Sequence, residues 1–255
     1  MSDAVIGVRG LTMAYGDFVL MRDLDFEVRR GDVFVIMGGS GCGKSTLLRH
    51  LLGLKEPAAG EIWYGDVNFT AAAPEVRDEL LRNVGVLFQS GALYSSLTLG
   101  ENIGRALEEY VPELPADEVR ELASLKLALV GLRGFEEYYP SEISGGMRKR
   151  AGLARALALD PEILCIDEPS AGLDPISSRL LDELILELRD SLGTTVVIVT
   201  HELASIFDIA STSVFLDVES RTMTALGPPL ELKDHASDAA VREFLNRGAQ
   251  PGDEP

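Results

Sequence analysis

The chain has 255 residues, of which 46% are hydrophobic and only 6% are aromatic, so it can bury a mainly aliphatic core in one large domain. Its formal net charge is −18. So acidic a surface argues against nucleic acid as the main ligand and against unaided binding to anionic lipid, because both need clustered Lys and Arg. Local basic patches remain compatible with this charge.

The two cysteines, Cys42 and Cys165, have no metal-ligand spacing to each other and favour a reducing compartment over a disulfide framework. The first residues, MSDAVIGVRG, lack the basic and apolar regions of a signal peptide. No apolar run approaches the roughly 18 residues of a membrane span. We therefore expect neither a signal peptide nor a transmembrane helix.

The first half of the chain predicts strands around one Gly-rich turn. Residues 32–37 (DVFVIM) are apolar and β-branched, as in a buried strand. A helix follows the turn and carries leucines on one face, at Leu47, Leu48, Leu51 and Leu52. Residues 60–66 predict a hairpin or short strand, and residues 84–89 (VGVLFQ) predict another buried strand.

Residues from about 95 to 158 have a mainly helical pattern, with breaks at Pro112, Pro115 and Pro140. The pattern then predicts a strand and turn (162–169), an amphipathic helix that ends at Gly193, a strand and turn (194–202) and a helix (202–211). Strands that alternate with helices indicate an α/β fold with a mostly parallel sheet covered on both faces. The helical block at about 90–160 is predicted to be an inserted subdomain, and residues 248–255 (GAQPGDEP) a flexible tail.

The Gly-rich turn matches the P-loop pattern G-x-x-x-x-G-K-[ST] between a strand and a helix. Its backbone N–H groups and the following helix N-terminus suit phosphate oxygens. Lys44 would reach the β and γ phosphates, and the hydroxyl of Ser45 would bind Mg²⁺. The motif comprises Gly38, Gly39, Ser40, Gly41, Cys42, Gly43, Lys44 and Ser45.

Further polar residues stand at the ends of predicted strands. Asp167 and Glu168 follow an apolar strand, where Asp167 would hold the magnesium shell and Glu168 would orient or deprotonate an attacking water. Gln89 follows the strand VGVLF and would contact Mg²⁺ and that water. His201 follows TVVIVT and would sense the γ-phosphate. Each alone has a plain alternative, such as a solvated acidic turn or a polar cap.

The order of these motifs closely resembles the ATP-binding subunits of ABC transporters over residues 5–247. GGSGCGKST, which extends the P-loop to Thr46, resembles their Walker A motif, ILCIDE their Walker B, ISGGM their signature and AGLD (171–174) their D-loop. The resemblance implies a single ABC ATPase domain over 1–247 with an N-terminal antiparallel β subdomain. It also implies that Tyr15 stacks on adenine, with an ordinary strand tyrosine as the alternative, and that Asp174 lies near the nucleotide.

In this family two ATPase domains pack head to tail, and each ATP lies between one P-loop and the partner's signature. Ser144, Gly145 and Gly146 can indeed present a hydroxyl, N–H groups and a helix N-terminus to a phosphate. Because the chain has one P-loop and one signature, the resemblance implies an ATP-driven homodimer with Mg²⁺. Met147, where most signatures have Gln, is expected to pack at the dimer interface.

Two stretches, 87–103 and 139–164, resemble the ATPases of MCE-associated phospholipid transporters, the maintenance-of-lipid-asymmetry type, as does DAAVREFLNRG at 238–248. This branch implies a place on the cytoplasmic face of the inner membrane. It also implies an integral-membrane permease that contacts Gln89 and the segment 90–97, a periplasmic MCE-domain protein and a small STAS-domain protein. The chain departs in having Tyr94 where Phe is usual and a short tail, which puts tail-mediated dimer contacts in doubt.

Three alternatives remain open. The first is an ABC ATPase for another cargo, such as an amino acid importer or a lipoprotein exporter. The second is a DNA-repair or translation ABC protein, but the chain lacks a second cassette, coiled coils and zinc sites. The third is a GTPase-like switch, and no Asn-Lys-x-Asp guanine motif is present. The residues 90–97 have their own alternative, which is to close the core of the helical subdomain.

Overall fold

The computed structural model describes residues 3–89 and 91–247. The chain forms two compact units, one that combines Met1–Leu80 with Thr195–Pro255 and one that consists of Leu81–Thr194. Ser90 and the tail predicted at 248–255 lie outside the described residues. None of the described helices combines the length and apolarity needed to cross a membrane.

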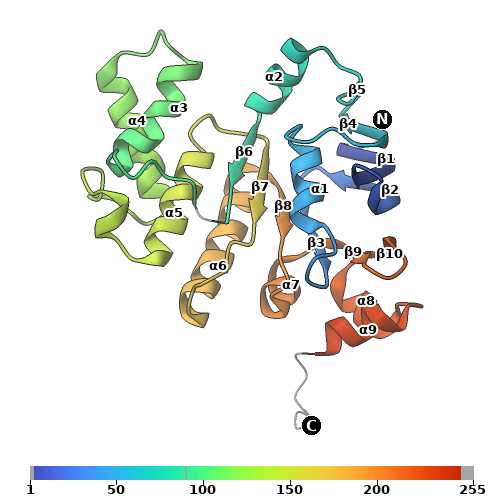
Figure 1. The fold of residues 1–255 in the computed structure, drawn as a ribbon. Coiled ribbons are helices and arrows are strands. Elements are labelled where there is room, and N and C mark those ends of the chain that lie inside the picture. Colours follow the sequence, from blue (N-terminus) through green and yellow to red (C-terminus); the bar gives the residue numbers. More distant parts are fainter. Residues whose placement is uncertain (1–2, 90, 248–255) are drawn as a thin grey trace. The chain divides into compact units, whose positions relative to one another are not determined.

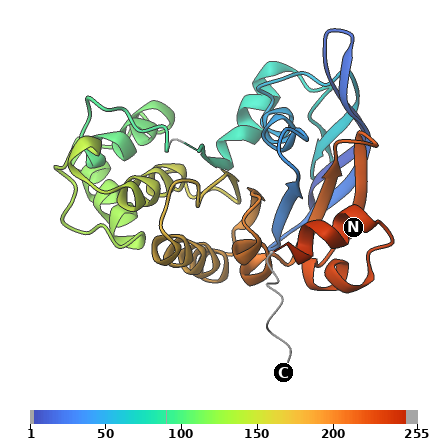
Figure 2. The same ribbon diagram turned by 60° about the horizontal axis from the view of Figure 1, so that its bottom comes forward.

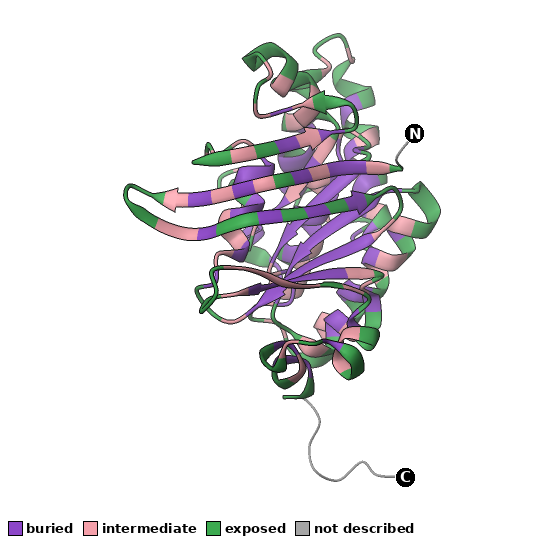
Figure 3. Cartoon of the chain, turned by 90° about the vertical axis from the view of Figure 1, so that its right-hand side faces the viewer, coloured by how far each residue is buried: buried purple, intermediate pink, exposed green. Residues whose placement is uncertain are grey.

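An antiparallel sheet in the first unit has the strand order β2-β1-β4-β5. Its strands are β1 (Ala4–Tyr15), β2 (Phe18–Arg29), β4 (Ala59–Tyr64) and β5 (Val67–Asn68). Buried and exposed residues alternate along the second half of β2, and the long strands of this sheet are accordingly banded in Figure 3. One face of the sheet therefore contributes to the core of the unit.

A second set of strands in the first unit is mainly parallel. β3 (Val33–Gly38) pairs in parallel with β8 (Thr195–Val199) and with β9 (Thr212–Asp217), and β10 (Thr222–Gly227) pairs antiparallel with β9. Every residue of β3 and β8 is buried. Such strands lack the alternation of a half-exposed strand, which is why they appear in the sequence as continuous apolar runs.

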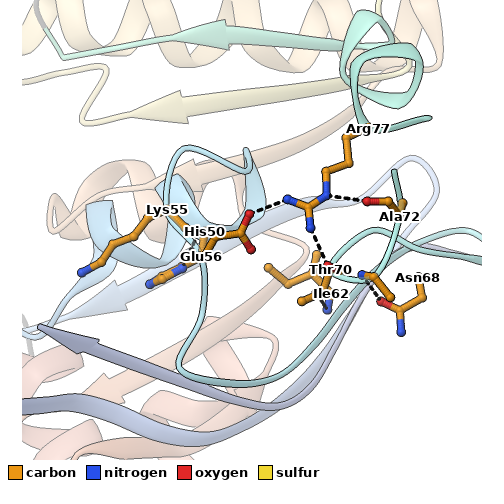
Figure 4. A network of polar contacts seen from close by, with 9 residues as sticks. His50, Lys55, Glu56, Ile62, Asn68, Thr70, Ala72 and Arg77 are labelled. Atoms are coloured by element: carbon orange, nitrogen blue, oxygen red, sulfur yellow. Dashed lines mark hydrogen bonds and ion pairs between the residues drawn. The ribbon is translucent and has the colours of Figure 1, made fainter. Parts of the chain in front are cut away.

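Helices α1 (Lys44–Leu51), α7 (Leu203–Ile209), α8 (Pro229–His235) and α9 (Ala239–Asn246) complete the first unit. α8 and α9 pack side by side (Figure 2). α2 (Pro74–Arg82) carries Arg77, whose guanidinium pairs with Glu56 at 2.5 Å and donates to the carbonyls of Thr70 and Ala72 (Figure 4). This side chain ties α2 to the loops on either side of β4 and β5.

In the second unit, β6 (Val84–Leu87) and β7 (Ile163–Asp167) pair in parallel, with Leu87 opposite Ile166. Three helices that contact one another, α3 (Leu99–Tyr110), α4 (Ala116–Leu129) and α5 (Gly145–Ala156), form the helical block (Figure 1). The short 3₁₀ helix η1 (Pro140–Glu142) precedes α5. Helix α6 (Pro175–Leu192) packs against α5. The expected breaks are confirmed, since α3 ends before Pro112, α4 begins after Pro115 and η1 begins at Pro140.

α5 lies very close to β6. A Cβ atom on Gly85 would stand 2.3 Å from the carbonyl oxygen of Ala156, and one on Gly152 would stand 2.8 Å from the side chain of Leu87. Only glycine at both positions allows the two backbones to approach this far. The helix that carries the SGGM sequence is therefore closely fitted to the strand that leads to Gln89.

Candidate functional site

The loop between β3 and α1 needs glycine at several positions. Gly38, Gly41 and Gly43 have φ of 148°, 77° and 98°. A Cβ atom on Gly38 would also lie 2.4 Å from the carbonyl oxygen of Leu216. The backbone thus adopts a conformation that L-residues with side chains avoid, as expected of a loop that curls its N–H groups around an anion.

The P-loop lysine is folded against its own loop. Lys44 is only 8% exposed, and its ammonium donates to the carbonyls of Gly38 at 3.0 Å and Gly39 at 3.1 Å. Cys42 is buried beside it, and burial raises the pKa of its thiol. The cysteine therefore acts as a small apolar residue here, and Lys44 is the charged group of the loop.

Tyr15 ends β1 and is held against α1. Its hydroxyl lies 3.2 Å from the hydroxyl of Thr46, and the ammonium of Lys55 lies 2.9 Å from the centre of its ring. The hydrogen bond with Thr46 lowers the pKa of the phenol, and the hydrogen bond and charge of Lys55 lower it further. The ring is 51% exposed. One face thus receives a cation, while the remaining surface is accessible to a planar ligand.

Lys55 itself is positioned by the P-loop helix. Nδ1 of His50, on α1, lies 2.7 Å from the carbonyl of Lys55, and both residues appear in Figure 4. His50 is buried, and burial lowers its pKa. A neutral ring that donates from Nδ1 satisfies this bond. The neighbouring carboxylate of Glu56 pairs with Arg77, and the ammonium of Lys55 lies over the tyrosine ring.

The acidic pair stands at the end of β7. Asp167 is the last residue of the strand and is 8% exposed. Glu168 comes next and has φ of 49°, an uncommon conformation for a residue other than glycine. Backbone strain of this kind often marks functional positions.

Lys149 joins Gln89 to Glu168. Gln89 stands two residues beyond β6, and its carbonyl accepts a hydrogen bond from the ammonium of Lys149. The same ammonium donates to the carbonyl of Glu168 at 3.2 Å. Burial lowers the pKa of Lys149, and the charges of Asp167 and Glu168 oppose this shift. The two strand ends of the second unit are thus linked by a side chain from α5.

Ser144 is the N-cap of α5, and its hydroxyl oxygen accepts from the N–H of Met147 at 3.2 Å. A serine hydroxyl that accepts in this way still has its own proton to donate. A Cβ atom on Gly145 would have no neighbour closer than 3.8 Å, and one on Gly146 none closer than 3.5 Å, the hydroxyl of Ser177. Neither glycine has a positive φ among the described residues.

Asp174 caps α6. Its carboxylate accepts from the N–H groups of Ile176 at 3.1 Å and Ser177 at 3.0 Å, and from the hydroxyl of Ser177 at 2.6 Å. The hydrogen bond from the Ser177 hydroxyl is the largest cause that lowers its pKa. The structure thus gives Asp174 a role in helix capping, and its predicted place near the nucleotide stays a prediction.

His201 lies just beyond β8 in the first unit, and its Nε2 stands 3.9 Å from the carboxylate of Glu202.

The predicted site residues are divided between the two units. The first unit contains His201, Tyr15 and residues 38–46, whereas the second contains Gln89, Asp167, Glu168, Asp174 and residues 144–146. Within the units the structure brings Tyr15 to Thr46 and links Gln89 to Glu168. The described residues contain no cluster of three or more His, Cys, Asp or Glu arranged for a metal ion.

Sequence reasoning missed Lys55 and Lys149, which organise these positions, and Asn102, whose amide donates to the carbonyls of the segment before α3. For Lys149 a signal was present, since it shares a helical face with Gly152, Leu153 and Ala156, and a charge on a buried stripe needs a partner. For Lys55 and Asn102 we find no comparable sequence signal.

Together, the P-loop between a parallel strand and a helix and the acidic pair at the end of β7 define an ATPase with a P-loop fold. The family model described as ABC transporter matches residues 21–171. The chain belongs to this family, and it is an ABC-type ATPase that binds ATP and serves as a transporter subunit.

Curated relatives extend the match along the chain. A probable ribonucleotide transport ATP-binding protein, mkl, of Mycobacterium leprae is 38% identical over 94% of this chain and 68% of its own length. The intermembrane phospholipid transport system ATP-binding protein MlaF is 39% identical in Haemophilus influenzae, over 82% of this chain and 79% of that protein. MlaF of Escherichia coli is 36% identical over 95% of this chain and 88% of its own length.

Solved structures confirm the expected fold. The cbiO1 protein from Clostridium perfringens, part of an ABC transporter complex, superposes with a TM-score of 0.83 at 25% identity, over 96% of this chain and 95% of that one. The ATP-binding cassette MJ0796, described as dimeric and bound to ADP and phosphate, gives a TM-score of 0.79 at 26% identity, over 88% and 98% of the two chains. The α/β ABC ATPase fold is therefore confirmed.

Proposed function

We propose that two copies of this chain form a head-to-tail dimer in which each ATP lies between the P-loop of one copy and residues 144–146 of the other. The observation that carries this proposal is the pair Gly145 and Gly146. Neither has a positive φ or a close neighbour that excludes a Cβ atom. Gly145 and Gly146 are the first two residues of α5, and glycine is a weaker helix former than Ala. A ligand that approaches this backbone from outside the chain explains why glycine stands at both positions.

The predicted residues then have defined roles. Lys44 and the loop from Gly38 to Thr46 bind phosphates, and Tyr15 stacks on the base. Glu168 orients or deprotonates the attacking water. His201 contacts the γ-phosphate, and Asp174 lies near the nucleotide of the dimer while it caps α6.

Ser45, Gln89 and Asp167 supply hydroxyl, amide and carboxylate oxygens, which is the donor chemistry that Mg²⁺ prefers. Mg²⁺ would need few protein ligands, because it usually keeps water and substrate phosphate oxygens in its shell. When bound, Mg²⁺ neutralises charge on the phosphate oxygens. Asp167, buried at the end of β7, is in a fixed position for such a role.

Phospholipid is the proposed cargo, carried between the inner and outer membranes by a complex with an MCE-domain protein. The similarity to MlaF over most of the chain and the SGGM signature support it. A small STAS-domain protein bound to the helical block is a further expected partner. The mkl relatives, whose name refers to ribonucleotide transport, favour a second candidate in which the same ATPase drives another cargo.

The permease is proposed to dock beside Tyr94. This ring is 56% exposed, whereas Leu93 and Leu97 are partly buried, so the segment both contributes to its own unit and presents an aromatic group. The buried amide of Asn102 accepts from the N–H of Tyr94 and donates to the carbonyls of Tyr94, Leu97 and Thr98. A groove of about 290 Å³ adjoins the ring, lined also by Tyr110, Arg105 and Arg155. A fixed aromatic group beside a groove suits a helix of a membrane partner.

A Tyr94→Asp variant tests this docking site. We expect loss of co-purification with the permease and retained ATP binding, because the ring is exposed and its backbone is held independently by Asn102. A Tyr94→Phe variant is the matched control and should co-purify normally. Normal co-purification of Tyr94→Asp would contradict the docking site and leave the ATPase assignment intact.

The cargo is tested by purifying the membrane complex through a tag on this chain and identifying the proteins and lipids that accompany it. We expect a multi-span permease, an MCE-domain protein and phospholipid above the level of a tag-only control. A complex with a solute-binding protein and no enriched phospholipid would contradict lipid transport and favour the second candidate.

A further inference from the structure

Lys149 occupies a position from which one side chain reaches two loops. It lies on α5, five residues after Ser144, and is 7% exposed. Its ammonium donates to the carbonyls of Gln89 and Glu168. These carbonyls follow β6 and β7, which are adjacent parallel strands. A helix that begins at the signature thus holds the backbone at both strand ends.

The contact with Glu168 falls where the backbone is strained. With φ of 49°, this residue is in a conformation that is unfavourable for residues other than glycine and persists only where the surrounding structure holds it. Its carbonyl accepts from the N–H of Ala171 at 3.3 Å as well as from Lys149. A hydrogen bond from an ionised donor is about twice as strong as a neutral one. Lys149 therefore helps to keep Glu168 in this conformation.

α5 is one continuous helix from Gly145 to Ala156, and it packs closely on β6. Gly85 and Gly152 fit β6 and α5 together so closely that a Cβ atom at either position would clash. Because Ser144 caps this helix and Lys149 lies in its next turn, the hydrogen-bonded backbone of α5 joins the two residues.

We propose that Lys149 is a positioning residue that couples the two ATP sites of the dimer. This inference rests on the function proposed above, in which Ser144 serves the ATP of the partner while Gln89 and Glu168 serve the ATP of their own chain. Closure of Ser144 and its neighbours on the partner's phosphate moves α5, and the ammonium of Lys149 carries that change to the two carbonyls. Hydrolysis in one site then depends on whether the other is occupied.

The test compares Lys149→Met with Lys126→Met in the full chain. Lys126 is a matched control, because it is another buried lysine of the second unit, 3% exposed, but its ammonium pairs with Asp160 at 2.5 Å. We expect Lys149→Met to lower kcat about thirtyfold or more while Kd for ATP changes less than about twofold. Lys126→Met should lower Tm and leave kcat within about threefold. Equal losses of kcat in the two variants would overturn the proposal.

A double-mutant cycle with Ser144→Ala distinguishes coupling between Ser144 and Lys149 from a role of Lys149 that only stabilises the loops after β6 and β7. If Lys149 transmits the state of Ser144, the two substitutions together should cost no more in kcat than the larger one alone. Losses that multiply would overturn coupling. Should Lys149→Met fail to fold, Lys149→Gln, whose shorter amide cannot reach both carbonyls, enters the same cycle with the same expected results.

Glu168→Gln distinguishes a failure of this inference from a failure of the proposed function. Substantial hydrolysis by Glu168→Gln would refute the assigned chemistry itself. Abolished hydrolysis together with an unaffected Lys149→Met would refute only the coupling.

Discussion

At the scale of single residues, Met147 is the departure from the usual signature. Its N–H is bonded to the hydroxyl of Ser144, and its side chain is half-buried. Anion binding at a helix start relies on backbone N–H groups and the capping hydroxyl, so an amide side chain is not needed there. The thioether is instead a flexible apolar group suited to an interface.

Met147→Gln should therefore keep ATP hydrolysis within about tenfold, which corresponds to roughly 1.4 kcal/mol of barrier. Gly145→Asp and Ser144→Arg should abolish it, because the first places a carboxylate and the second a long side chain where the phosphate approaches. Steady-state ATPase rates check all three. A loss of several hundredfold for Met147→Gln would mean that the thioether itself is required.

His50 supplies a prediction about pH. Burial lowers its pKa in the folded state, so below the ordinary value of about 6.5 the unfolded state binds more protons than the folded one. The free energy of unfolding should therefore be highest above that pH, and it should decrease as the pH falls below it. Between pH 7.5 and 5.5, His50→Gln should lose less Tm than the wild type, since its amide can still donate to the carbonyl of Lys55.

Thermal melts at the two pH values measure this difference, with His235→Gln as the control because that ring is exposed. Equal losses of Tm in His50→Gln and the wild type would contradict the conclusion that burial of His50 causes the loss of stability at low pH.

At the scale of elements, two kinds of glycine in the second unit differ in what surrounds them. Gly85 allows β6 and α5 to approach, whereas Gly146 has no neighbour within 3.5 Å of its Cβ position. The first kind serves packing inside the chain. The second kind has no such purpose, which is the basis for the proposed approach of a ligand.

Gly85→Ala should destabilise the protein by about 1–3 kcal/mol, because its Cβ atom meets backbone that cannot move aside. Gly146→Ala should leave Tm unchanged or slightly higher and still lose most ATPase activity. Melting curves and ATPase rates on the same two proteins test the distinction. Normal activity in a folded Gly146→Ala protein would remove the main support for the dimeric site.

At the scale of the whole molecule, one chain contains one P-loop and one SGGM sequence. A Glu168→Gln variant, which binds ATP but cannot complete hydrolysis, should therefore dimerise with ATP and remain monomeric with ADP. Sedimentation velocity measures this change. A variant that stays monomeric with ATP even beside its membrane partners would contradict the head-to-tail model.

Much of the fold could be read from local patterns. β3, β7 and β8 are buried throughout and therefore appear as apolar runs, and the proline breaks mark helix ends. β1 is harder to read, because register shifts along its pairing with β2 interrupt the alternation of apolar and polar residues. The sequence predicts that Gln89 ends a strand, but β6 ends at Leu87, because the chain turns there and the N–H of Gly91 donates to the carbonyl of Phe88 at 2.8 Å.

The sequence by itself determined the α/β class, the P-loop and the order of the polar strand ends, because these depend on residues close together in the chain. The tertiary structure alone decided that Lys149 meets Gln89, 60 residues away, and that Lys55 covers one face of Tyr15. It also decided that no described residue outside α5 lies closer than 3.5 Å to a Cβ position on Gly146. Such contacts depend on how helices seat on strands. That seating is fixed by packing across the fold, which no local pattern encodes.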